Sequence, residues 1–106
     1  MNKVELAMSL IAGAGDSRYH AMEAINLAKA GNFTGAREEL NLAKESMVEV
    51  HEIQTYLIRD EISGKLSEVS LLMVHAQDHL TQAMMYRELA VNFIDLYETI
   101  YKERKE

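Results

Sequence analysis

The segment that decides the fold spans residues 67–102 and has the sequence SEVSLLMVHAQDHLTQAMMYRELAVNFIDLYETIYK. Its side chains can be placed around a helix by rotating each residue by about 100° from the one before. With His75 taken as zero, a first apolar stripe spans about 60–160°. This stripe holds Val69, Leu72, Met73, Ala76, Leu80, Ala83, Ala90, Val91 and Ile94. The stripe predicts a long helix that packs against other helices.

A second apolar stripe of the same segment is centred on His75. It holds Leu71, Leu89, Phe93, Leu96, Tyr97 and Ile100, together with the polar residues His75, Asp78, His79 and Gln82. Within a single three-helix subunit, the other two helices cover only one apolar stripe of this helix, and the second stripe would face water. The second stripe therefore favours self-association. The remaining side of the helix, which includes Gln77 and Thr81, is polar and is expected to face solvent.

Two further helical segments precede this one. The first covers about residues 3–30, and we expect a kink or break at residues 13–17, where glycine, aspartate and serine weaken the helical pattern. The second covers about residues 34–63 and carries an apolar seam with alternating four- and three-residue spacing. Because the connections at residues 31–32 and 64–65 are short, the fold class is predicted to be all-α, an antiparallel bundle of three long helices. A chain of this length fits one domain.

Composition restricts the function further. The chain has 106 residues, a net charge of −6, and no proline, cysteine or tryptophan. The absence of proline permits long helices, and the absence of cysteine excludes disulfides, thiolate metal sites and cysteine nucleophiles. An acidic chain without a basic stripe is not expected to bind nucleic acid. No apolar run approaches the ~20 residues of a membrane span, and Glu5 interrupts the apolar stretch near the N-terminus, so we expect a cytoplasmic protein without membrane insertion or a signal peptide.

His75 and His79 are four residues apart and therefore lie on one face of the predicted helix. One interpretation is structural, with both histidines hydrogen-bonded at an oligomer interface. Another is a zinc site completed by Asp78 or by a residue of another helix, because zinc sites use this spacing. The third is nucleophilic, because a neutral imidazole attacks phosphorus and the resulting phosphohistidine passes its phosphoryl group on. Residue types and spacing alone leave all three open.

In the nucleophilic interpretation, His75 carries the phosphoryl group and neighbouring side chains hold its oxygens. The candidate hydrogen-bond donors are His79, Gln82 and Gln54. Gln54 is included because it lies, with Glu61, on the apolar seam of the second helix, where a polar residue often sets register or lines a site. The sequence has no phosphate-binding glycine loop, so direct nucleotide binding is not expected.

Asp78 lies among the apolar residues of the second stripe. If the chains associate around a symmetry axis, copies of Asp78 approach one another, and clustered carboxylates repel. The carboxylates must then either take up protons or bind a cation, because an ionised group away from water is costly. Converging carboxylate oxygens suit Mg²⁺ or another hard divalent ion. The residues alone leave protonation of the Asp78 carboxylates and a cation held by one Asp78 from each subunit both open.

The sequence VSLLMVHAQDHL at residues 69–80 resembles the signature of the lactose/cellobiose-type enzyme IIA of the bacterial sugar phosphotransferase system. Three further stretches resemble the same family. They are residues 15–18, residues 21–33, and residues 51–55 followed by Glu61. The resemblance covers nearly the whole chain in the expected order. One departure is Thr81, where the family commonly has methionine, and its predicted place on the solvated side leaves the site unaffected.

The resemblance implies a phosphotransferase component that forms a homotrimer of three-helix subunits. His75 would accept a phosphoryl group through Nε2 from the histidine phosphocarrier protein (HPr). It would pass the group to a cysteine of the cognate enzyme IIB, which phosphorylates a sugar during its import through the membrane enzyme IIC. Asp78 would coordinate a metal on the trimer axis, and His79 would support the acceptor. The alternative is a non-enzymatic helical oligomerisation module with a buried histidine and aspartate metal site.

Overall fold

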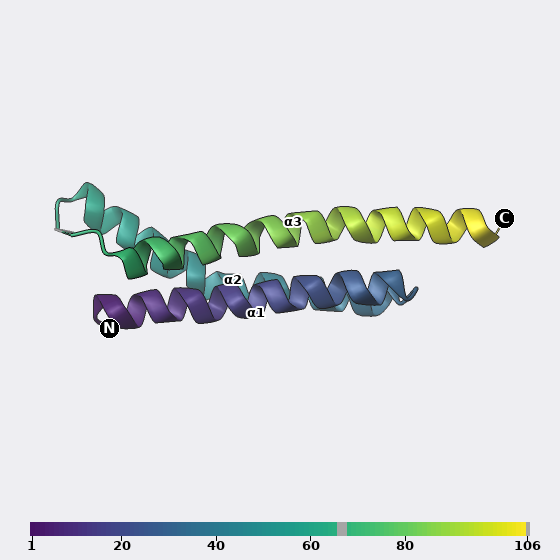
Figure 1. The fold of residues 1–106 in the computed structure, drawn as a ribbon, viewed down its shortest axis with the longest axis horizontal. Helices are drawn as coiled ribbons and strands as arrows, with labels where there is room; N and C mark the ends of the chain where they lie inside the picture. Colours follow the sequence, from purple (N-terminus) through teal and green to yellow (C-terminus); the bar gives the residue numbers. More distant parts are fainter. Residues whose placement is uncertain (66–67, 106) are drawn as a thin grey trace.

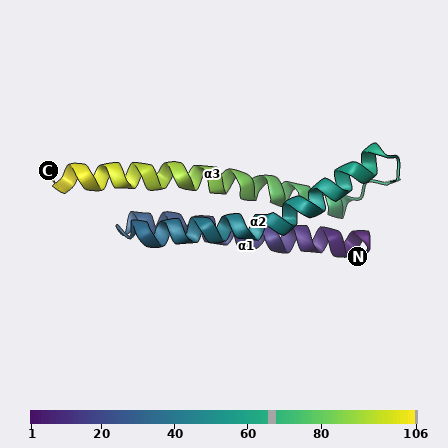
Figure 2. The same cartoon turned by 180° about the vertical axis from the view of Figure 1, so that it is seen from behind.

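Three helices form an elongated bundle in the computed structural model, which describes residues 1–65 and 68–105 (Figure 1). Helix α1 spans Lys3–Lys29, α2 spans Phe33–Ile62, and α3 spans Leu71–Lys105. No strand occurs within these two described ranges. Helices α1 and α3 run in the same direction and α2 runs against both, as the reverse view also shows (Figure 2). The predicted all-α, antiparallel three-helix architecture is confirmed.

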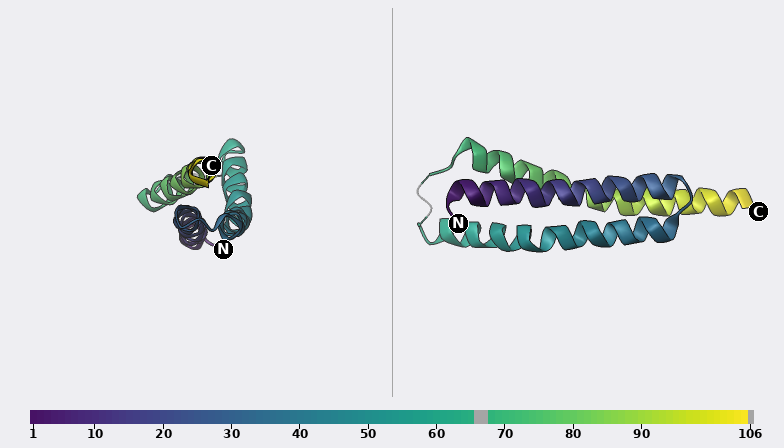
Figure 3. Two further views of the ribbon diagram at one scale, coloured as in Figure 1. Left: turned by 90° about the vertical axis from the view of Figure 1, so that its right-hand side faces the viewer. Right: turned by 90° about the horizontal axis from the view of Figure 1, so that it is seen from below.

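The bundle is long and thin, measuring 61 × 19 × 19 Å. The N-terminus lies at one end and the C-terminus at the other, and the last turns of α3 extend beyond the turn that joins α1 to α2 (Figure 3). Among the described helices, none combines the length and the apolar character needed to cross a membrane.

Side-chain caps set where the helices begin. The side-chain oxygens of Asn2 and Asn32 accept hydrogen bonds from Glu5 N and Gly35 N, both at 2.9 Å. Ser70 Oγ accepts from Met73 N at 3.1 Å and caps the first turn of α3 in the same way. A capping residue itself lies outside the helix. Residues 68–70 are therefore not helical and α3 starts directly after Ser70, whereas the predicted start near residue 67 lies outside the described residues.

The core is a seam of small residues. On α1 the buried positions alternate in steps of three and four residues, namely Ala7, Leu10, Ala14, Ser17, Ala21, Ala24 and Ala28. This spacing keeps one narrow face of a helix turned toward its partners. The apolar pattern of the sequence correctly includes Ala7, Ala14 and Ala28, but it also includes Val4, Met8 and Met22, which are exposed. The pattern does not include Ser17, Ala21 or Ala24, whose small side chains also allow the helices to pack closely.

The segment at residues 13–17 forms neither a kink nor a break, since α1 is helical throughout and straight in the figure (Figure 1). Its small residues serve packing against α2 instead. Ser17 is fully buried and its hydroxyl donates to the carbonyl oxygen of Ala43 at 2.8 Å. At Gly13 an added Cβ would overlap Cγ2 of Val50. Hydrogen bonding and close helix contact explain residues that looked like helix breakers in the sequence.

Gly13→Ala and Gly15→Ala are expected to change stability in different directions. Alanine favours a helix over glycine by up to about 1 kcal/mol, and a Cβ at Gly15 would meet no atom within 4 Å. Gly15→Ala should therefore stabilise the protein, whereas overpacking against Val50 should make Gly13→Ala about 1–3 kcal/mol less stable than Gly15→Ala. Chemical unfolding at one fixed protein concentration measures both. Equal unfolding free energies for the two variants would contradict the close contact between Gly13 and Val50.

The first apolar stripe of α3 faces the other helices, as predicted, through Ala76, Leu80, Ala83, Ala90 and Ile94. Two of its predicted members are exposed. Val69 precedes the helix, and Val91 lies at the edge of the stripe. The second stripe is open in the single chain, with Leu71 85%, Leu89 49% and Leu96 52% exposed.

Candidate functional site

The central feature of the site is a contact between two histidine side chains on α3. Nε2 of His75 lies 3.0 Å from Nε2 of His79. The two rings meet edge to face, with centroids 4.5 Å apart and planes at 89°. His75 is exposed and His79 is half-buried. The four-residue spacing thus produces the proximity that the sequence predicted, and it leaves the His75 ring accessible to another protein.

The short contact restricts how protons are placed on the pair. Two neutral imidazoles form this hydrogen bond when one Nε2 carries a proton and the other offers a lone pair. If His79 Nε2 donates, Nε2 of His75 keeps its lone pair and its ring is held in place. A phosphoryl group that approaches Nε2 of His75 would then have its oxygens close to the N–H of His79. This tautomer fits a nucleophile with a neighbouring hydrogen-bond donor.

Asp78 and Gln82 follow the histidines on the same side of α3. Gln82 Nε2 donates to Asp78 Oδ2 at 3.1 Å, and Asp78 is exposed. Gln82, which the sequence predicted to donate a hydrogen bond to the phosphoryl group, thus donates to the Asp78 carboxylate within one chain.

A complete metal site is not formed by one chain. In the part of the chain that the structure describes, no three histidine, aspartate or glutamate side chains gather closely enough to hold an ion. The zinc interpretation, completed by Asp78 or by another helix, therefore finds no third ligand among these residues. In the single chain, α3 turns His75 and Asp78 away from α1 and α2, and burial of this cluster at an oligomer interface stays a prediction.

Gln54 lies apart from the histidine pair. Its Nε2 donates to Oε1 of Gln77 at 3.1 Å, which joins α2 to α3. Gln77 is two residues after His75, so it lies on a nearly opposite side of α3. Gln77 was expected to be fully solvated, yet it is half-buried because α2 approaches this side of the helix. Within one chain, Gln54 and His75 are therefore not brought together.

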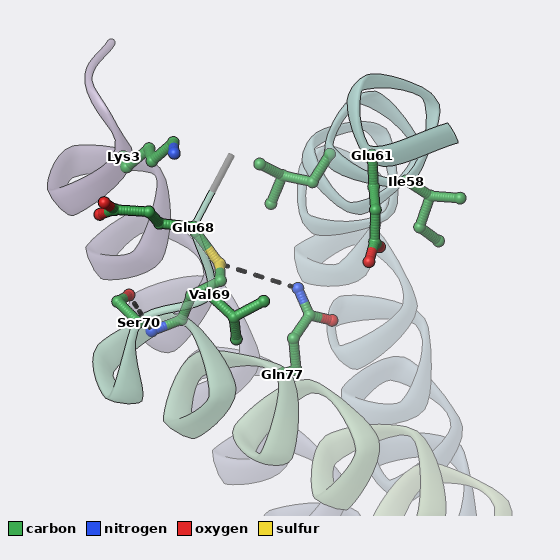
Figure 4. A pocket seen from close by; sticks show the side chains of 9 residues that line it. Lys3, Ile58, Glu61, Glu68, Val69, Ser70 and Gln77 are labelled. Atoms are coloured by element: carbon green, nitrogen blue, oxygen red, sulfur yellow. Dashed lines mark hydrogen bonds between the residues drawn. The ribbon is translucent and has the colours of Figure 1, made fainter. Parts of the chain in front are cut away.

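A pocket of about 290 Å³ lies near the connection between α2 and α3 and is formed without either histidine of the pair (Figure 4). Gln77 enters it from α3 and Glu61 from α2. Glu61 was predicted to lie on the seam of α2 but is exposed at this pocket. The pocket and the histidine pair are separate features of the molecule.

A second groove, of about 390 Å³, lies directly beside His79. It is lined by α1 residues that include Arg18 and Tyr19. Arg18 did not emerge from the sequence as a site residue, because nothing in the pattern of α1 predicts which of its exposed side chains adjoin the histidines of α3.

The other two histidines lie elsewhere. His20 Nδ1 is 2.6 Å from Glu39 Oε2 and joins α1 to α2, while His51 is exposed on α2. Neither takes part in the contact between His75 and His79.

Comparison with known proteins adds an independent observation. Residues 5–98 match the family model described as PTS system, Lactose/Cellobiose specific IIA subunit. The chain is 43% identical over 100 residues to the lichenan-specific phosphotransferase enzyme IIA component of Bacillus subtilis (strain 168), covering 94% of this chain and 91% of that protein.

Solved structures agree in fold over the whole length. The crystal structure of the PTS cellobiose-specific enzyme IIA from Bacillus anthracis superposes with a TM-score of 0.91 at 42% identity, covering 96% of this chain and 94% of that one. A IIA(Chitobiose) chain solved in complex with HPr, from the N,N'-diacetylchitobiose branch of the Escherichia coli phosphotransferase system, gives a TM-score of 0.81 at 34% identity and covers 95% of this chain and 99% of that one. Sequence, helix arrangement and near-complete coverage all lead to one conclusion: this chain belongs to the lactose/cellobiose-specific IIA family of the phosphotransferase system.

Proposed function

We propose that this protein carries a phosphoryl group on Nε2 of His75 during sugar import. The observation that supports the proposal is the 3.0 Å contact between Nε2 of His75 and Nε2 of His79 on an accessible face of α3. In the tautomer in which His79 Nε2 carries the proton, His75 Nε2 has a lone pair, and this lone pair can attack phosphorus once the N–H of His79 turns away from it. Membership of the IIA family makes phosphoryl transfer the relevant chemistry.

In the proposed step, the lone pair of His75 Nε2 forms a bond to the phosphorus atom held by a phosphohistidine of the donor protein. The donor's phosphorus–nitrogen bond breaks, and its electron pair returns to the donor ring. His75 keeps its proton on Nδ1, so no proton has to leave during the transfer. The N–H of His79 turns from the lone pair of His75 to a phosphoryl oxygen, where it stabilises the negative charge.

HPr is the proposed donor, because a related IIA chain has been solved in complex with HPr. The proposed acceptor is a cysteine of the cognate enzyme IIB, which passes the group to a sugar entering through enzyme IIC. Such exchanges place the protein in the cytoplasm. Both transfers require His75 to be reachable from outside the subunit, and its exposure meets this requirement.

A homotrimer is the proposed assembly. The second stripe of α3 exposes Leu89, Phe93 and Leu96 in the single chain, and apolar side chains in a continuous row favour burial against copies of the same chain. In a three-fold arrangement the copies of Asp78 would converge toward the axis, and their carboxylates would hold a divalent ion such as Mg²⁺. The donor set fits a hard cation, because each chain offers an exposed carboxylate that is already oriented by Gln82.

Removing divalent ions with a chelator is expected to weaken the assembly of the parent protein. Mg²⁺ at a hundred times its dissociation constant would stabilise the assembly by about 2.7 kcal/mol, and chelation removes this contribution. Asp78→Asn keeps the shape of the side chain without its charge, so its assembly should not respond to the chelator. Thermal unfolding and sedimentation with and without chelator measure the effect. An unchanged unfolding temperature for the chelated parent would argue against a cation between the Asp78 side chains.

A further inference from the structure

Arg18 on α1 lies next to α3, near two of its side chains. It lines the groove of about 390 Å³ that also contains His79. Its guanidinium carbon is 5.1 Å from the centroid of the Tyr86 ring, which places the cation over the face of that ring. Arg18 thus contacts the Tyr86 ring and shares a groove with His79.

His75, His79 and Tyr86 share one face of α3. Tyr86 follows His75 by eleven residues, or about three turns, and ends up about 20° from it around the helix. His79 lies between them, and the distance along the axis from His79 to Tyr86 is about 10 Å. The Tyr86 ring, over which the guanidinium of Arg18 lies, is therefore on the same face of α3 as the proposed acceptor.

The hydrogen-bonding capacity of Arg18 is not used by an acidic partner. Among the described residues, no carboxylate forms an ion pair with Arg18, in contrast to Arg37, which pairs with Glu98. Arg18 is also exposed, so its long side chain is free to change rotamer. A cation–π contact at an exposed site is weaker than a charge-assisted pair of hydrogen bonds from guanidinium to phosphoryl oxygens. A phosphoryl group near His79 would therefore compete well with the Tyr86 ring for the guanidinium of Arg18.

The site needs a cation of this kind. A phosphoryl group on His75 adds negative charge to a chain whose net charge is already −6 and places it three residues from Asp78. Among the described residues that line the groove with His79, Arg18 is the one that carries a positive charge. Electrostatic stabilisation is the main contribution that a protein makes to phosphoryl transfer.

We propose that Arg18 moves from the face of Tyr86 to the phosphoryl group of phosphorylated His75 and binds two of its oxygens. The inference rests on the proposed role of His75 and adds a second phosphoryl-binding side chain from a different helix. Arg18 forms and breaks no covalent bond. It balances charge while the phosphorus–nitrogen bond to the donor breaks and the bond to His75 forms.

The direct test is to follow the side-chain Nε–H resonance of Arg18 by NMR before and after phosphorylation with phosphoenolpyruvate, enzyme I and HPr. Binding to the phosphoryl group should shift this resonance and slow its exchange with water. Arg59, which is exposed on α2, is the matched arginine and should show no change. If Arg18 and Arg59 remain equally unaffected while His75 is phosphorylated, the assignment of Arg18 is wrong.

Kinetics provide a second, independent readout. Arg18→Gln should slow transfer from phosphorylated HPr to His75 by about ten- to hundredfold, because a charge-assisted hydrogen bond is lost. Arg18→Lys keeps the charge without the two-bond geometry and should recover part of the rate. Arg59→Gln makes the same charge change away from the site and should transfer at the parent rate.

The possible outcomes separate the two proposals. If the parent protein accepts no phosphoryl group, both the carrier function and the role of Arg18 are overturned. If the parent is phosphorylated and Arg18→Gln reacts as fast as Arg59→Gln, only the role of Arg18 is overturned. Circular dichroism of each variant confirms that a rate difference does not come from loss of the helical fold.

Discussion

His75→Gln is expected to abolish phosphorylation of this protein by phosphoenolpyruvate, enzyme I and HPr. Glutamine fills a similar volume and can still bond to His79, but its amide nitrogen has no lone pair available to form a bond to phosphorus. The parent should take up one phosphoryl group per chain as an acid-labile, base-stable phosphohistidine. No label should remain in the variant when transfer is followed with radioactive phosphoenolpyruvate.

His51→Gln is the matched control for this experiment. His51 is also an exposed histidine on a helix, but it lies on α2 and is not part of the contact between His75 and His79. It should label as strongly as the parent. Labelling of His75→Gln at the parent level would show that the acceptor is another residue. A parent that takes up no label would favour the oligomerisation module instead.

Phe93→Glu is expected to convert the proposed trimer to monomers. Phe93 lies 18 residues after His75, or five helical turns, and therefore on the centre of the second stripe. It is 41% exposed in the single chain, and we place it in the trimer interface. Truncating one of the few central residues on which an interface depends costs about 2 kcal/mol or more. Glutamate would remove the Phe93 ring and bring three carboxylates together near the axis, which adds repulsion.

Sedimentation at several protein concentrations measures the change from three chains to one. Val48→Glu is the control, because Val48 is an apolar residue exposed on α2, away from the second stripe. It introduces the same charge and should leave the assembly trimeric. Should Phe93→Glu sediment like the parent, the interface would have to lie on another surface.

The helical periodicity was sufficient to predict the fold class, but several residues on the buried face were missed. Leucine, valine and methionine dominate a hydrophobic pattern, so the sequence drew attention to Val4 and Met8, which are exposed. The buried face of α1 is instead made of alanine together with Leu10 and Ser17. Small residues carry little hydrophobic signal of their own, and their value depends on how closely a neighbouring helix approaches.

At the candidate site, too, the sequence predicted the contact within one helix but not the contacts between helices. The spacing of His75 and His79 predicted their contact, because a four-residue step is a local property of any helix. Gln54 and Arg18 come from other helices, and their positions relative to His75 depend on how α1, α2 and α3 are rotated and aligned. The predicted closeness of Gln54 to His75 was not found within the chain, whereas the closeness of Arg18 to His79 was not predicted.

The sequence by itself determined the three long helices and the histidine pair, because these follow from residue spacing within one segment. Only the tertiary structure decided that residues 13–17 are packed rather than broken, that Gln54 joins Gln77, and that Arg18 lies beside His79. These features arise between helices, where close packing of small side chains fixes the rotation and offset of each helix. The helical pattern of one segment does not predict the offset between that helix and its neighbours.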